Sequence, residues 1–208
     1  MKPTNRRVFL KEAGTLLTAG AALGVGGAWG FHEATSGVQA AENQSSTDQQ
    51  KKNTMKVIIA ADPFAMSLKK AVAEYLKEKG HEIIDLGSTA EKEIPYFECG
   101  VTASKALQAG KADRAILMCG TGMGMSIVAN RFKGVTAAVV ESVFAAKMCR
   151  AINNANALCM GSMIWGDWMA KEAVEVFLTT NLADGLPQFA DFLKEANKKV
   201  EAIAPGQK

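Results

Sequence analysis

An apolar segment that runs directly into closely spaced glycines is the strongest chemical signal in this sequence. Residues 116–126 read Ile-Leu-Met-Cys-Gly-Thr-Gly-Met-Gly-Met-Ser. The glycines, Gly120, Gly122 and Gly124, permit positive φ angles and close approach of a ligand to the backbone. A helix that begins there directs backbone N–H groups toward an anion. The segment therefore predicts an anion or oxyanion cradle, although the same glycines also serve in many α/β folds only to bring a helix against a strand. No Gly-Lys-Ser/Thr follows, which excludes a nucleotide P-loop.

The elements that position this turn follow a βαβ pattern, because short apolar runs alternate with amphipathic helical stretches. We expect a Rossmann-like three-layer α/β/α sandwich with a five-stranded parallel sheet. The expected strands are 56–61, 82–86, 114–118, 135–140 and 157–160. The expected helices are 67–79, 98–108, a helix from the glycine turn to about 131, then 142–154, 167–179 and 187–202.

Ligands of such folds bind beyond the carboxyl ends of the strands. The groups that this rule places at the binding edge are Asp62, Cys119–Met125, Glu141 and Gly161–Gly166.

Composition fits one globular domain with an additional N-terminal segment. The chain has 208 residues, of which 48% are hydrophobic and 22% charged, with a formal net charge of +3. Residues 1–40 hold four basic and two acidic residues, so the remainder carries +1. A nearly neutral domain does not suggest a nucleic-acid partner.

The N-terminal segment predicts export. Residues 4–11 read Thr-Asn-Arg-Arg-Val-Phe-Leu-Lys, which resembles the twin-arginine motif, and an apolar stretch follows over 13–30. Small residues at Val38 and Ala40 favour cleavage after Ala40, and an uncleaved membrane anchor is the alternative. We expect a twin-arginine signal peptide over 1–40, a linker over 41–54 and a folded α/β domain over 55–208. The expected partner is the twin-arginine export machinery, and the expected location is the periplasm or another exported site.

Four cysteines, Cys99, Cys119, Cys149 and Cys159, lack the spacing of a zinc site. Spacing alone leaves a disulfide between any two of them open. No metal or cofactor is expected.

Three stretches resemble the ribose-5-phosphate isomerase B and galactose-6-phosphate isomerase family, over about residues 55–200. They are the Cys-Gly-Thr-Gly-Met-Gly turn, the Lys-Val-Ile-Ile-Ala-Ala-Asp strand at 56–62, and Ala-Asn-Arg-Phe-Lys-Gly at 129–134. In that family a base moves a proton between the first two carbons of a sugar without a metal, and backbone amides stabilise the enediolate. One branch uses a cysteine that ends the third strand, and Cys119 matches it. Met125 stands where the other branch has a glutamate base.

The resemblance implies a site in which Cys119 and Thr121 are catalytic. The substrate-binding residues it implies are Asp62, Gly120, Gly122, Met123, Gly124 and Asn153. It also implies a homodimer whose sites borrow residues from both subunits, with the helix over 187–202 as an exchanged arm.

The sequence departs from the family pattern at its histidines and arginines. Pro63 and Ile152 stand where members carry histidines, and the remaining histidine of the domain, His81, is expected to be solvated or capping. Met163 replaces an arginine, and residues 186–190 lack the Arg-His-x-x-Arg pattern. Arg131 and Arg150 remain as carboxylate partners or surface helix residues. Met163, Trp165 and Trp168 lie near the expected mouth, either to stack on a sugar or to pack in a core or dimer.

The leading hypothesis is an aldose–ketose isomerase that acts on a non-phosphorylated, open-chain sugar or uronate, with Cys119 as the base. A linear substrate needs no histidine for ring opening. Two alternatives stay open: a ribose-5-phosphate isomerase proper, and a sugar-binding protein without turnover.

Overall fold

A computed structural model describes residues 54–203 of the chain. The predicted signal peptide and nearly all of the predicted linker lie outside these residues. The strands are β1 (Lys56–Ala61), β2 (Glu82–Asp85), β3 (Arg114–Cys119), β4 (Ala137–Val139) and β5 (Ala157–Gly161). The α-helices are α3 (Met66–Glu78), α4 (Tyr96–Gln108), α5 (Met123–Ala129), α6 (Val143–Ala151), α7 (Asp167–Thr179) and α8 (Ala190–Glu201), and two 3-10 turns are η1 (Pro63–Ala65) and η2 (Pro187–Phe189).

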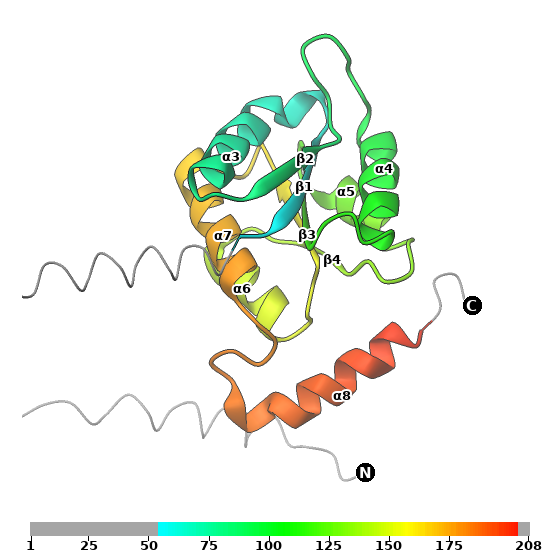
Figure 1. The fold of residues 1–208 in the computed structure, drawn as a ribbon, viewed down its shortest axis with the longest axis vertical. Coiled ribbons are helices and arrows are strands. Elements are labelled where there is room, and N and C mark those ends of the chain that lie inside the picture. The colour runs from blue at the N-terminus through cyan, green and yellow to red at the C-terminus, as the bar shows by residue number, and fades with distance from the viewer. Residues whose placement is uncertain (1–53, 204–208) are drawn as a thin grey trace, which may run out of the picture. The chain divides into compact units, whose positions relative to one another are not determined.

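The five strands form one parallel sheet in the order β2-β1-β3-β5-β4 (Figure 1). The register pairs Ala61 with Met118 and Cys119 with Gly161, so the ends of β1, β3 and β5 are level with one another. This confirms the predicted parallel, Rossmann-like sheet. It also places the strand ends that carry the sequence signals side by side at one edge, the carboxyl edge.

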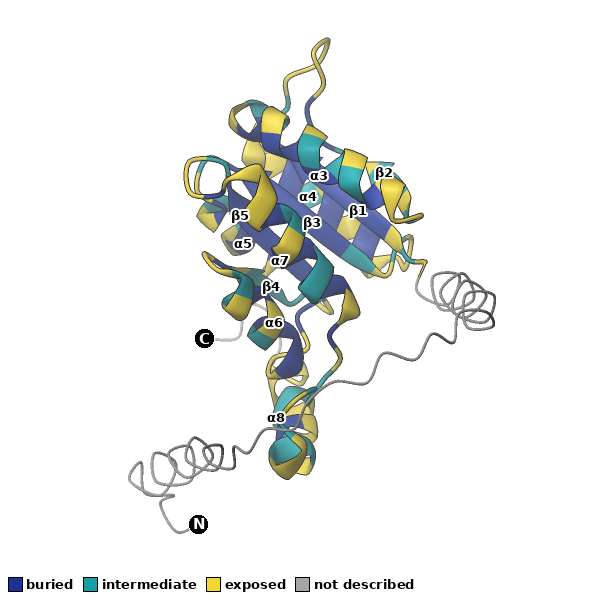
Figure 2. Ribbon diagram, turned by 90° about the vertical axis from the view of Figure 1, so that its left-hand side faces the viewer, coloured by how far each residue is buried: buried dark blue, intermediate teal, exposed yellow. Residues whose placement is uncertain are grey.

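Helices cover both faces of the sheet because alternate strand residues point to opposite sides. Val57 and Ile59 pack in a core with α3, α6 and α7, whereas Ile58 and Ala60 pack in a second core with α4 and α5. Figure 2 shows the buried sheet between these helix layers. The two cores thus bury both faces of the central strands.

Element ends differ from the expected ones by a few residues. The predicted helix over 187–202 divides into η2 and α8, because Pro187 begins a turn in which the Ala190 N–H bonds to the Pro187 carbonyl. The predicted fourth strand shortens to Ala137–Val139, where the Asn130 side chain bonds both the N–H and the carbonyl of Ala137. This amide covers the exposed edge of the sheet.

Within residues 54–203, no helix is both long and apolar enough to cross a membrane. All four cysteines are free thiols with buried side chains.

Candidate active site

The loops after three neighbouring strands are tied together at the carboxyl edge of the sheet. The Asp62 N–H after β1 donates to the Met118 carbonyl at 3.1 Å. The Ser162 N–H after β5 donates to the Cys119 carbonyl at 2.9 Å, and its hydroxyl donates to the Phe64 carbonyl at 2.9 Å. These bonds hold the ends of β1, β3 and β5 as one platform around Cys119.

Cys119 is the last residue of β3 and is only 6% exposed. Its Sγ accepts a hydrogen bond from the Gly122 N–H at 3.1 Å. Gly122 adopts φ +79 as the residue before α5. An N–H donor on the sulfur stabilises negative charge there, as a thiolate base requires.

The glycines of the turn also allow close packing. A Cβ on Gly122 would lie 2.8 Å from the backbone of Met160, and a Cβ on Gly124 would lie 2.6 Å from the ring of Tyr96. On β5, a Cβ on Gly161 would lie 2.6 Å from the backbone of Thr121. The turn therefore requires its glycines for close helix–strand packing, the second of the two roles that the sequence left open.

The outer side of the turn is open to solvent. Thr121 is exposed, and its Oγ1 accepts from the Met123 N–H at 3.4 Å. Met123 is 48% exposed, and the 71% exposed Met163 extends across Gly120, where a Cβ would lie 3.3 Å from the Met163 methyl group. A substrate that approaches Cys119 meets a hydroxyl and two thioether side chains.

Asp62 lies beside this platform and is almost fully buried. Its Oδ1 accepts from the Phe64 N–H at 3.1 Å, which starts η1. Burial raises the pKa of the Asp62 carboxyl, and the backbone N–H groups of Phe64 and Ala65 act in the opposite direction. The carboxylate is thus held in place while its charge is poorly solvated.

Asn153 lies at the opposite edge from Cys119. It follows the end of α6. Three residues further along the chain, the Asn156 carbonyl accepts from the Ala115 N–H near the start of β3, so this segment lies at the amino edge. The length of β3, roughly 16 Å at the usual rise per residue, separates this region from Cys119. Within one chain, the structure brings together Cys119, Asp62 and the glycine turn, and it leaves Asn153 outside the group.

The arginines of residues 54–203 also lie away from Cys119. Arg114 begins β3, Arg131 follows α5, and Arg150 occupies the last turn of α6, all at the amino edge. The expectation of a surface position for Arg150 is wrong, since it is 3% exposed. Its donors bind the carbonyls of Thr180 and Ala155 and the side chain of Asn154.

Two tryptophans near the mouth have different environments. Trp165 is 4% exposed and donates its indole N–H to the Val140 carbonyl at 2.9 Å, so it belongs to the core. Trp168 is 87% exposed.

His81, expected to be solvated or capping, is partly buried and accepts from the Met55 N–H at 3.2 Å through Nδ1.

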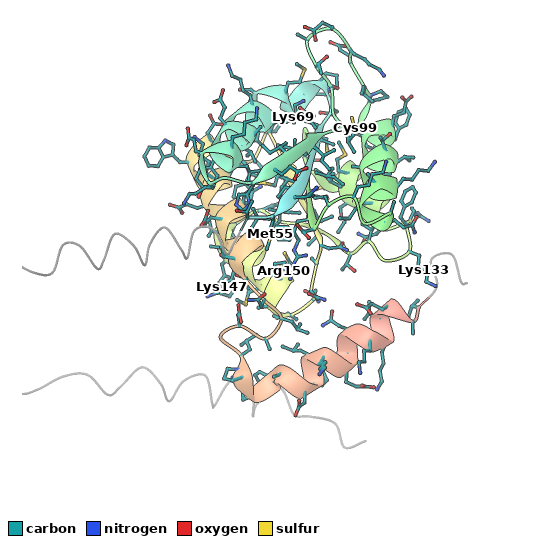
Figure 3. All side chains as sticks on the ribbon, viewed as in Figure 1. Met55, Lys69, Cys99, Lys133, Lys147 and Arg150 are labelled. Carbon is teal, nitrogen blue, oxygen red and sulfur yellow. The ribbon has the colours of Figure 1, made fainter. Side chains whose placement is uncertain are left out.

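An ion pair between the buried Lys69 and the exposed Asp85 lies near the site and was not predicted from the sequence. Lys69 Nζ donates to Asp85 Oδ2 at 2.7 Å and to the Ser88 carbonyl at 2.6 Å. Figure 3 shows Lys69 and Cys99 toward the carboxyl edge, where this lysine holds the loop after β2. Lys69 shares a helical face with Val72 and Leu76, a spacing that marks it as inward-facing.

Comparison with known proteins adds to this geometry. The family model described as Ribose/Galactose Isomerase matches residues 57–194. The chain belongs to this family. It is 48% identical over 151 residues to a 4-deoxy-4-sulfo-D-erythrose isomerase of Clostridium sp. (strain MSTE9), a match that covers 72% of this chain and 95% of the relative.

Two further relatives are ribose-5-phosphate isomerases B. That of Escherichia coli (strain K12) is 33% identical over 148 residues, which cover 71% of this chain and 93% of the relative. The crystal structure of the Thermotoga maritima protein is 34% identical, with a TM-score of 0.65 over 72% of this chain and 99% of that chain. The protein is therefore an aldose–ketose isomerase of this family, and its fold is that of the type B ribose-5-phosphate isomerases.

Proposed function

We propose that this isomerase acts on a linear, non-phosphorylated sugar with an acidic end group, and that Cys119 transfers the proton. The observation that supports the base is the hydrogen bond from the Gly122 N–H to Cys119 Sγ at 3.1 Å. Within residues 54–203 no arginine lies near Cys119 of its own chain, which supports a substrate without a phosphate.

In the proposed mechanism, the Cys119 thiolate removes the proton from C2 of the aldose. The electron pair of that C–H bond forms the C1–C2 double bond, and the carbonyl oxygen becomes an enediolate oxygen. The Thr121 hydroxyl and the backbone N–H groups of the turn stabilise this charge, a type of contact whose loss typically costs about 100- to 1,000-fold in rate. After a proton moves between the two oxygens, the Cys119 thiol returns its proton to C1 and the ketose forms.

A linear substrate explains why no ring-opening histidine is needed. Pro63 and Ile152 stand where the resemblance places histidines. A four-carbon sugar whose C4 carries a sulfonate in place of a hydroxyl has no oxygen that can close a five-membered ring. The substrate named for the sulfo-erythrose isomerase relative is of this kind. A sulfonated tetrose is therefore our first candidate, and an open-chain uronate belongs to the same chemical class.

A phosphate ester is disfavoured by the charges of the described residues. Within one chain, their three arginines, Arg114, Arg131 and Arg150, lie away from Cys119, and the Lys69 ammonium is engaged by Asp85 and the Ser88 carbonyl. The positions at which the resemblance places phosphate-binding arginines, Met163 and residues 186–190, carry none. Each hydrogen bond to a charged group contributes about 1.5–3 kcal/mol, so a dianion without such donors loses much of its affinity.

The substrate assignment is tested by comparing kcat/KM for 4-deoxy-4-sulfoerythrose, a linear ketouronate and ribose 5-phosphate, with product formation followed by proton NMR. We expect conversion of at least one of the first two and little of the third. A preference for ribose 5-phosphate would contradict the substrate class and leave the base assignment intact.

We also propose a homodimer in which Asn153 of one copy completes the site of the other. Asn153 is exposed and lies far from Cys119 of its own chain, and α8 carries the exposed apolar side chains Phe192 and Val200. Mixing Cys119→Ala with Asn153→Ala subunits tests this arrangement. Random mixing restores about one quarter of the sites if Asn153 acts across the interface, and none if it acts within its own chain.

Export by the twin-arginine route remains a proposal from the sequence, supported by Arg6 and Arg7 and the apolar stretch behind them. Replacement of both arginines by lysine is expected to retain the protein in the cytoplasmic fraction with residues 1–40 still attached. Unchanged export of that variant would contradict the proposal.

A further inference from the structure

Exposed apolar side chains lie in each of the three segments that follow β1, β3 and β5 around Cys119. Phe64 comes after β1, Met123 after β3 and Met163 after β5, and their exposed fractions are 72%, 48% and 71%. Grouped apolar side chains on the surface of a domain commonly mark a place that another molecule covers. Because these segments surround the proposed base, a substrate bound at Cys119 lies among them.

Met163 is held over the residue that follows the base. Its N–H donates to the Gly120 carbonyl at 3.0 Å, and the Ser162 N–H before it donates to the Cys119 carbonyl at 2.9 Å. A Cβ on Gly120 would lie 3.3 Å from the Met163 methyl carbon and 3.5 Å from its sulfur. The Met163 thioether therefore lies against the backbone that a substrate must approach, while most of its side chain stays open to contact.

The acid group of a four-carbon substrate must lie close to the same thioether. In the proposed function, on which this step rests, Cys119 removes the proton from C2 of a short linear sugar acid. At ordinary bond lengths, two C–C bonds and one C–S bond place the sulfur of a C4 sulfonate within about 4 Å of C2. The acid group therefore shares the immediate surroundings of Cys119, and the side chains there determine which acid is accepted.

The charges that border Cys119 in its own chain do not favour a dianion. The Cys119 thiol and the neighbouring Asp62 carboxyl both become negative when they ionise, and Thr121 offers a neutral hydroxyl. The Lys69 ammonium near this edge is already paired with Asp85 at 2.7 Å. The electrostatic cost of removing an ion from water grows with the square of its charge, so beside apolar and negative groups a dianion is bound less well than a monoanion.

We propose that Met163 is a specificity-determining residue of this isomerase. Its apolar side chain selects a substrate with a singly charged acid group, a sulfonate or a carboxylate, against one with a dianionic phosphate or phosphonate. Phe64 and Met123 extend the same apolar surface. The selection acts on the charge of the acid group and not on its shape, so a phosphonate that is a poor substrate as a dianion becomes a good one as a monoanion.

The test compares kcat/KM for 4-deoxy-4-sulfoerythrose and for its phosphonate analogue, in which phosphorus replaces sulfur, between about pH 6 and pH 9, around the second ionisation of the phosphonate. The ionisation of Cys119 affects both substrates alike, so the ratio of the two kcat/KM values reports the charge of the acid group. The variants are Met163→Leu, which keeps the surface apolar, and Met163→Lys, which adds a cation. Met169→Lys adds the same charge at a 37% exposed methionine of α7 and is the matched control.

We expect the wild type and Met163→Leu to prefer the sulfonate by roughly tenfold or more at the upper end of this pH range, and the ratio to fall toward one as the phosphonate takes up its second proton. Met163→Lys should reduce the preference roughly tenfold, and Met169→Lys should change it by less than about twofold. Equal kcat/KM values for the two acids, a ratio that does not change with pH, or equal effects of the two lysine substitutions would each overturn this inference and leave the proposed function in place. Conversion of neither acid would overturn the proposed function and this inference with it.

Discussion

Replacement of Gly122 by alanine tests the turn on which the proposed base depends. Gly122 adopts φ +79, and a left-handed conformation costs a non-glycine residue about 1–2 kcal/mol. The added Cβ would also lie 2.8–3.1 Å from three backbone atoms of Met160 in β5. Backbone of a central strand yields little, and overpacking typically adds about 1–3 kcal/mol. We therefore expect Gly122→Ala to lose about 2–5 kcal/mol of unfolding free energy.

Gly80→Ala is the matched control for this change. Gly80 has a similar φ of +84, but a Cβ there meets nothing within 4 Å, so only the conformational cost applies. Urea unfolding of both variants separates the two contributions, and Gly122→Ala should exceed the control by about 1–3 kcal/mol. Its kcat should also fall, because the Gly122 N–H moves away from Cys119. Equal losses in the two variants would refute the argument that the turn requires glycine for close packing.

Three further predictions concern Lys69, Asp62 and Met163. Lys69→Met should destabilise the protein by about 2 kcal/mol in urea, because it removes the hydrogen bonds of the Lys69 ammonium to Asp85 and to the carbonyl of the buried Ser88. Lys56→Met at an exposed pair should cost under about 1 kcal/mol, and equal effects would contradict this. Asp62→Asn should be more stable than the wild type near pH 7, because burial raises the pKa of Asp62 in the folded state. The gain in stability should shrink as the pH falls through that raised pKa and vanish below 3.8, the ordinary pKa of the carboxyl. A gain that persists below pH 3.8 would show that the buried charge of Asp62 is not its cause. Met163→Arg should raise kcat/KM for ribose 5-phosphate by about tenfold, because the new guanidinium would lie over Gly120. An unchanged kcat/KM would argue against a phosphate subsite at this position.

The sheet could be predicted from the sequence because each strand is a short apolar run next to an amphipathic helix. The β3 run into Cys119 and the glycines after it specified both the strand end and the helix start. Element ends were less certain because local hydrogen bonds set them. The side chain of Asn130, for example, binds Ala137 in β4, and no spacing rule indicates that contact.

The site residues that come directly after a strand could be placed from the sequence. The positions of residues that depend on tertiary contacts could not. Asp62 and Cys119 meet because parallel strands end at one edge. The burial of Arg150 was not foreseen, since a lone arginine in a helix is usually exposed. Asn153 lies away from Cys119 because α6 returns to the amino edge before β5 begins, a consequence of topology that becomes plain once the strand order is known.

The most direct test of the central claim is solvent deuterium exchange followed by proton NMR. The wild type, Cys119→Ala and Cys119→Ser are each incubated in D2O with 4-deoxy-4-sulfoerythrose or a linear ketouronate. The account predicts that the wild type introduces deuterium at the carbon beside the carbonyl and forms the isomer, and that both folded variants lose exchange and isomerisation together. Exchange that persists in the Cys119 variants would show that another group removes the proton and would contradict the account.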